Sequence, residues 1–208
     1  MPRRATSREL DRIRENLTQN LARVDNLVRT YETHPQARGG GRKSAELLDI
    51  LRASVVLLHA SLEDVLRSTA RWKLPLAAAE ALNAIPLKGH GPNPKKFLLG
   101  DLAGFRGKSV DSVFDESVAA HLEQSNYNNT AEITALLAGI GVDVGLVNAQ
   151  FADLQGLMER RHQIVHRADR QASVVGRGDH RVRAINREQV RAWIAAVQSF
   201  SAALFAQL

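Results

Sequence analysis

The stretch VGLVNAQFADLQGLMERRHQIVHRAD (residues 144–169) sets apolar side chains at helical spacing along most of its length. Steps of three and four residues separate the apolar side chains from Val147 to Leu157, as one buried face of an α-helix requires. We therefore predict a helix that begins near Val144 and ends around Ala168. Its predicted buried side chains are Val147, Phe151, Leu154, Leu157, Met158, Ile164 and Val165.

The last ten residues of this stretch, 160–169, hold two histidines and three arginines. Histidine exchanges protons near neutral pH, and the arginine guanidinium pairs with phosphate oxygens through two parallel hydrogen bonds. His162 and His166 are four residues apart and share a helix face. Arg161 and His166 are five apart, about 140° around the axis. This combination favours phosphoester chemistry, with RNA as the expected substrate.

An apolar helix is predicted over residues 44–73, which carry leucines and valines on more than one side. Such a helix belongs at the centre of the fold. It also carries His59 and Glu63, four residues apart on one face, and a buried polar pair must find partners. Two explanations remain: a hydrogen-bonded pair in the core or at the surface, or an approach of Glu63 to the arginine and histidine of the later helix.

Long helices are also predicted at the two ends of the chain. The N-terminal stripe would pack within the domain or across a dimer, and packing within the domain is favoured. A glycine-rich loop follows it to residue 43. The C-terminal helix has Asn186 and Gln189 as a cap and an apolar stripe from Val190 to Phe205. The N-terminal stripe consists of Leu10, Ile13, Leu17, Leu21, Val24, Val28 and Tyr31.

Prolines and glycines divide residues 75–110 into short pieces, and this region is basic, with Lys95 and Lys96 as candidate RNA contacts. Strand signals are restricted to short valine-rich pieces. The predicted fold is all-α: a helical bundle with a long N-terminal helix and an irregular, loop-rich insertion at about 75–110. We expect one domain over residues 1–208, with residues 1–43 as N-terminal helix and loop and 44–208 as the core.

Composition limits the possible functions. The chain has 208 residues and no cysteine, which removes disulfides, thiolate catalysis and cysteine-ligated zinc. Without an export signal or a membrane-spanning stretch, a cytoplasmic protein is expected. The net charge is +6, and between residues 160 and 191 nine arginines outnumber three acidic residues by the same amount. This cluster favours a polyanionic partner, although a solvated basic helix face would have the same composition.

Several other sites are disfavoured by their sequence context. Gly39–Gly41 lack the P-loop pattern, and the glycines at 139–145 close a helix instead of following a strand. His162 and His166 have the spacing of zinc ligands, but Gln163 replaces the metalloprotease glutamate and a third ligand is missing. A serine nucleophile elbow is also missing. We therefore expect neither a metal nor a cofactor.

The pattern at Arg161, His162 and His166 resembles the signature of the HEPN superfamily, in which an arginine, a polar residue and three further positions precede a histidine. The segment 59–64, His-Ala-Ser-Leu-Glu-Asp, resembles the acidic position that these proteins often carry on an earlier helix. Residues 114–123, 133–141 and 161–169 look most like a prokaryotic HEPN branch linked to RNase L-type domains. The resemblance extends from about residue 45 to the end of the chain, although its central motif is short.

This resemblance implies a metal-independent endoribonuclease that acts as a homodimer with a composite active site. His166 would move a proton at the ribose 2′-hydroxyl or at the leaving 5′-oxygen, and Arg161 would stabilise the phosphorane. His162, where the family more often has Asn, would orient the phosphate or Arg161, or carry a second proton. Glu63 would fix Arg161 or His166. Arg160 and Arg167 would surround the site as RNA contacts.

The resemblance also leaves the biological role open among toxins, antiviral effectors and RNA-processing factors, with a possible antitoxin or other regulatory partner. Ala168 stands where nucleotidyl-acceptor relatives carry a tyrosine, so such a modification is not expected here. The alternative is a non-catalytic HEPN module that binds RNA or a partner protein, in which the arginine and histidines act as phosphate contacts.

Overall fold

The computed structural model describes residues 2–39, 41, 43–90, 98–169 and 182–208, and the side chains among them from residue 8 onward. This part of the chain is helical and contains no β-strand, so the predicted all-α class is confirmed. The α-helices are α1 (Pro2–Thr33), α2 (Pro35–Arg38), α3 (Ala45–Lys73), α4 (Ala79–Leu82), α5 (Val110–Gln124), α6 (Thr130–Gly139), α7 (Phe151–Arg167) and α8 (Arg187–Phe205).

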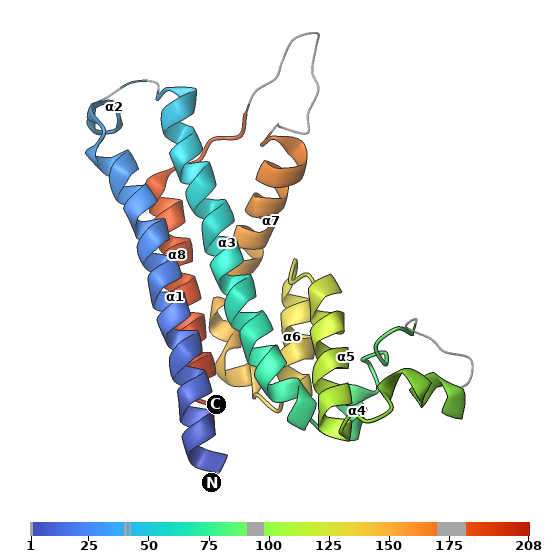
Figure 1. The fold of residues 1–208 in the computed structure, drawn as a ribbon. Coiled ribbons are helices and arrows are strands. Elements are labelled where there is room, and N and C mark those ends of the chain that lie inside the picture. Colours follow the sequence, from blue (N-terminus) through green and yellow to red (C-terminus); the bar gives the residue numbers. More distant parts are fainter. Residues whose placement is uncertain (1, 40, 42, 91–97, 170–181) are drawn as a thin grey trace.

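Helix α3 is the centre of the bundle, because it contacts α1, α7 and α8 (Figure 1). The apolar residues predicted on more than one of its sides are largely buried, which confirms its central position. The main hydrophobic core draws on α1, α3, α6, α7 and α8. Its fully buried members include Leu51, Leu58, Leu62, Leu154, Leu157, Phe200 and Leu204.

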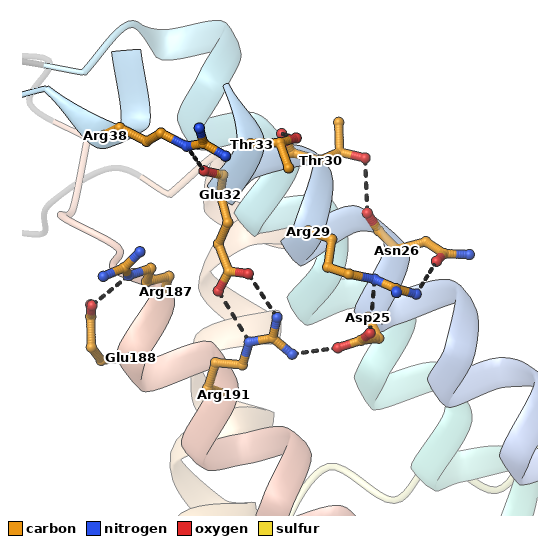
Figure 2. A network of polar contacts seen from close by, with 10 residues as sticks. All are labelled: Asp25, Asn26, Arg29, Thr30, Glu32, Thr33, Arg38, Arg187, Glu188 and Arg191. Carbon is orange, nitrogen blue, oxygen red and sulfur yellow. Dashed lines mark hydrogen bonds and ion pairs between the residues drawn. The ribbon is translucent and has the colours of Figure 1, made fainter. Parts of the chain in front are cut away.

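The apolar stripe of α1 packs within the chain, which is the alternative that the sequence favoured. Six of its seven apolar residues, from Ile13 to Tyr31, are buried in the main core, and Leu10 packs against it. Polar contacts add to this packing at one end of the bundle (Figure 2). There Arg191 of α8 binds Glu32 of α1 through two hydrogen bonds, of 3.2 and 2.9 Å, and also pairs with Asp25. Residues 1–43 thus contribute directly to the core, while their grouping with 44–208 into one domain stays a prediction.

The described residues between α3 and α5 form short pieces, as the prolines and glycines of this region predict. Among them are α4 and the 3₁₀ helices Leu74–Leu76 and Leu99–Phe105. A second, smaller apolar cluster joins the end of α3 to α5 through Ala70, Leu74, Val118 and Leu122. None of the described helices is long and apolar enough to cross a membrane.

Helix α7 begins at Phe151, seven residues later than predicted. Two 3₁₀ turns, Val144–Leu146 and Asn148–Gln150, precede it. The carboxylate of Asp143 accepts a 2.8 Å hydrogen bond from the backbone of Gly145. Such local side-chain bonds compete with α-helix formation, which explains the late start. Val147 lies before the helix and is nevertheless completely buried.

The predicted end of α7 at Ala168 is confirmed. Ala168 and Asp169 both take left-handed backbone conformations, with φ of 47° and 58°. The N–H groups of both residues bond to the carbonyl of Gln163, in the manner of a helix terminus that reverses the chain direction. The chain therefore turns sharply only two residues after His166.

Candidate active site on α7

The second half of α7 presents its two histidines side by side at the surface. His162 and His166 are both exposed, and their ring centroids are 4.7 Å apart with the ring planes inclined by 44°. Arg161, the residue before this pair, is half-buried, and Arg167 is exposed. The helical spacing read from the sequence therefore does bring the two imidazoles together.

The opposite face of α7 holds the helix in place. Leu154, Leu157 and Met158 are buried in the main core, and Ile164 packs against it. Val165 was predicted to join them, but the prediction is wrong because its side chain is 47% exposed. One residue corresponds to a rotation of about 100° in a helix. The step from Ile164 to Val165 therefore turns the side chain away from the core.

His59 and Glu63 of α3 lie behind this surface. His59 is 1% exposed, and its Nδ1 is 3.6 Å from Oε2 of Glu63, whose side chain is 18% exposed. Burial lowers the pKa of His59, the carboxylate of Glu63 opposes that effect, and the nearby positive charge of Arg161 lowers the pKa further. The pair is therefore an ion pair of the core, as the first explanation has it, while an approach of Glu63 to the arginine and histidine of α7 stays a prediction.

Tyr127, in the turn between α5 and α6, is a neighbour of His59. Its side chain is buried, and its backbone lies against His59. Burial raises the pKa of Tyr127 to about 12. The phenol is therefore neutral over the physiological range, and Glu63 and Arg161 are the charged groups that shift the pKa of His59.

Arg160 occupies a different position from the one predicted. It was expected to contact RNA, but it is only 4% exposed and its Nη2 lies 2.7 Å from Oδ2 of Asp169. The same nitrogen donates to the backbone carbonyls of Arg183 and Ala184, at 3.0 and 3.2 Å. The prediction is corrected, because a guanidinium that is buried and paired inside the protein is not available to a phosphate.

The other predicted site residues divide into three groups. Arg167 is exposed, as an RNA contact requires, whereas Lys95 and Lys96 lie outside the described residues. Glu63 has His59 as its ion-pair partner, and among the described residues no hydrogen bond or ion pair joins it to Arg161 or His166. No cluster of three potential metal-ligating His, Asp or Glu side chains occurs in the described ranges.

Sequence reasoning missed three residues around this site. His59 was considered only as the partner of Glu63, and Asp169 was given no role of its own. Arg52, whose Nε lies 2.7 Å from Oδ2 of Asp169, was not considered at all. Arg52 and Asp169 are 117 positions apart, so local spacing contains no signal for that pair.

Comparison with known proteins places this arrangement in a family. A family model described as RiboL-PSP-HEPN matches residues 13–208. The chain belongs to the RiboL-PSP-HEPN family. The matched residues include α3, α7 and α8, and therefore both His59–Glu63 and the exposed histidines. Membership of this HEPN family connects the chain with RNA-related functions in general. No curated protein and no solved structure matches it.

Proposed function

We propose that this RiboL-PSP-HEPN protein is a metal-independent endoribonuclease that cleaves RNA by attack of the 2′-hydroxyl. The observation that carries the proposal is the exposed pair of imidazoles, 4.7 Å apart, beside Arg161 on α7. A group that transfers protons must be able to reach the substrate. His162 and His166 meet this requirement, because they are exposed at the end of a helix that is packed firmly against the core. Family membership supports an RNA-related role.

The reaction needs two proton transfers at one phosphate. One base takes the proton of the 2′-hydroxyl as its oxygen attacks phosphorus. An acid gives a proton to the 5′-oxygen as the P–O5′ bond breaks, and this leaves a 2′,3′-cyclic phosphate and a 5′-hydroxyl. In the proposal His166 performs one transfer and His162 carries the second proton. Arg161 stabilises the charge of the phosphorane.

Glu63 is proposed to act as a positioning residue. It pairs with His59, and His59 borders Arg161. The carboxylate therefore acts on Arg161 through a buried imidazole and through its own negative charge. Arg167, exposed one residue after His166, is proposed to contact the RNA backbone.

The substrate and partners proposed are RNA, a second copy of the chain and a regulatory protein. In a homodimer Arg161 and His166 of two subunits would meet in one composite cleft. An activity that destroys RNA fits a toxin or an antiviral effector in the cytoplasm, kept inactive by an antitoxin or a comparable inhibitor.

Cleavage of single-stranded RNA in EDTA by the purified protein tests the proposal. The wild type should cut, whereas Arg161→Ala and His166→Ala should each lose activity by about 100-fold or more while they keep their helical circular dichroism. His34→Asn is a matched control. It removes an exposed imidazole but keeps a capping side chain at the start of α2, where His34 Nδ1 accepts a hydrogen bond from Gln36.

Two results would overturn the proposal. One is cutting that persists in both Arg161→Ala and His166→Ala, which would mean a contaminating nuclease or a different site. The other is RNA binding without turnover by the wild type. Affinity that falls steeply with salt would then identify the chain as a non-catalytic RNA-binding module.

A further inference from the structure

Two arginines share one buried carboxylate at the end of α7. Oδ2 of Asp169 lies 2.7 Å from Nε of Arg52 on α3 and 2.7 Å from Nη2 of Arg160 on α7. The side chains of Asp169, Arg160 and Arg52 are 2%, 4% and 12% exposed. Arg52 also binds Asp49, at 2.9 Å, but that carboxylate is 68% exposed. Asp169, Arg160 and Arg52 form what we call the Asp169 cluster.

The Asp169 cluster ties together three parts of the chain that are separate in sequence. Asp169 follows α7, Arg52 belongs to α3, and the carbonyls of Arg183 and Ala184 accept from Arg160. The carbonyl of Asp169 also accepts a 2.8 Å hydrogen bond from the backbone N–H of Arg183. Nη1 of Arg183 in turn donates to the side chain of Gln163 on α7, at 2.8 Å.

Residues of the cluster, and the Gln163 side chain that Arg183 binds, flank the proposed site residues in the sequence. Arg160 precedes Arg161, Gln163 follows His162, and Asp169 comes three residues after His166. Every one of these neighbours is fixed by a hydrogen bond, whereas the exposed imidazoles have no hydrogen bond to a described residue. The cluster therefore adds directed bonds at the last two turns of α7 to the apolar contacts that Met158 and Ile164 make with the core.

We propose that Asp169 is a positioning residue for the proposed ribonuclease site and that it acts through Arg52 and Arg160. It holds the end of α7 in the one arrangement that sets Arg161, His162 and His166 toward a common phosphate. The inference rests on the proposed function for its catalytic consequence. Its structural consequence, a fixed environment for the two imidazoles, is independent of that function.

The energetics favour a role in positioning over a role in stability alone. Burying an ion pair removes two charges from water, and the desolvation cost often equals the gain from their attraction. Among the described residues, Nε and Nη1 of Arg160 and Oδ1 of Asp169 find no hydrogen-bond partner, so this cost is incompletely offset. Apolar side chains would pack this corner equally well. They would not fix a helix end to two other segments through directed bonds.

The test compares Asp169→Asn with Asp49→Asn. Asparagine keeps the shape of aspartate and tolerates the left-handed conformation at position 169, so the change removes little besides the charge. Asp49→Asn removes the exposed partner of the same Arg52. For Asp169→Asn we expect kcat on RNA to fall by about 10- to 100-fold with KM within about two-fold, because misplaced catalytic groups slow the chemical step. Asp49→Asn should match the wild type.

A second readout does not need activity. In protein with ¹⁵N-labelled histidine, the ring signals of His162 and His166 should shift or broaden in Asp169→Asn and stay unchanged in Asp49→Asn. If the wild type does not cut RNA, the proposed function fails and these signals alone decide the positioning role. Should Asp169→Asn not fold, Arg52→Lys, which keeps the charge but loses the Nε bond, carries the same measurements. Unchanged ring signals, or unchanged kcat in a variant with a lowered melting temperature, would overturn the inference.

Discussion

Arg160 and Arg167 lie two turns apart on the same side of α7, yet their surroundings are opposite. Arg160 is buried against Asp169, whereas Arg167, in the last turn, faces solvent. The guanidinium of Arg160 therefore serves folding, whereas the guanidinium of Arg167 is available to a phosphate.

Substitution by methionine should separate these two roles. In Arg160→Met the buried carboxylate of Asp169 loses the more deeply buried of its two arginine partners, so the free energy of unfolding in urea should fall by about 3 kcal/mol. In Arg167→Met it should change by less than about 0.5 kcal/mol. Only Arg167→Met should flatten the salt dependence of RNA binding, by about one unit in the logarithmic slope. A fully stable Arg160→Met with weakened RNA binding would restore Arg160 as an RNA contact.

His59 gives the protein a pH dependence whose sign follows from its burial. The pKa of His59 is lowered in the folded protein, while the unfolded chain keeps a value of about 6.5. As pH falls, the unfolded state binds the proton first. The contribution of His59 is therefore complete above the unfolded pKa and is lost as pH falls through the folded pKa. Glu63 weakens this effect, and Arg161 strengthens it.

The urea midpoint should thus be lower at about pH 5.5 than at about pH 7.5, and His59→Gln should reduce that difference. Burial also lowers the pKa of His121 on α5. Part of the difference should therefore survive in His59→Gln and become smaller still in the double variant with His121→Gln. A pH dependence that is identical in wild type and His59→Gln would contradict the buried, neutral imidazole.

The candidate site could be predicted from sequence only where its geometry is local. The face shared by His162 and His166 follows from a spacing of four residues, and the structure places their rings in contact range. The burial of Arg160 depends on Asp169 and on the backbone at 183–184, after the chain has turned back. Nothing in the spacing of residues 160–169 distinguishes that arginine from its neighbour Arg161.

At the scale of the helices, α8 is joined to α1 by a polar contact and by the main hydrophobic core that both helices share. Arg191 lies between Asp25 and Glu32 with 37% of its side chain exposed (Figure 2). Solvent screens ion pairs at such exposure. Leu58 of α3, in the same core, is completely buried, and its apolar contacts do not depend on screening by salt.

The two kinds of contact should differ in their effect on stability. Arg191→Met should lower the free energy of unfolding by about 1 kcal/mol or less, and by still less in high salt. Leu58→Ala should lower it by about 2–5 kcal/mol at any salt concentration, because it leaves a cavity in the core. Urea titrations at low and high salt measure both. A loss for Arg191→Met as large as that for Leu58→Ala would show that the ion pairs, not the core, join the helices.

Helix boundaries were predictable where a local cap determines them. Asn186 accepts from the backbone of Gln189 and starts α8 as predicted, and Ser44 caps α3 in the same way. The start of α7 was not predictable from apolar spacing, because Asp143 binds the backbone of Gly145 and holds the chain in 3₁₀ turns. Val147 is buried, as its apolar spacing predicts, but it does not belong to α7. A helix start inferred from apolar spacing alone therefore lies too early in the sequence.

For the whole molecule, the composite site predicts a homodimer. Light scattering at micromolar concentration should give twice the chain mass of 22.9 kDa. His166→Ala should give the same mass, because the substitution removes an exposed side chain without disturbing the core. A monomer at these concentrations would count against an active site shared between two copies.

The chemistry of the products tests the central claim most directly. A DNA oligonucleotide with one internal ribonucleotide is incubated with the wild type in EDTA, and the fragments are weighed by mass spectrometry. The proposal predicts one cut, on the 3′ side of the ribonucleotide, which leaves a 2′,3′-cyclic phosphate and a 5′-hydroxyl, with no cut in the all-DNA control. Equal cutting of the all-DNA strand, or fragments with a 5′-phosphate, would contradict attack by the 2′-hydroxyl and with it the roles of His166 and Arg161.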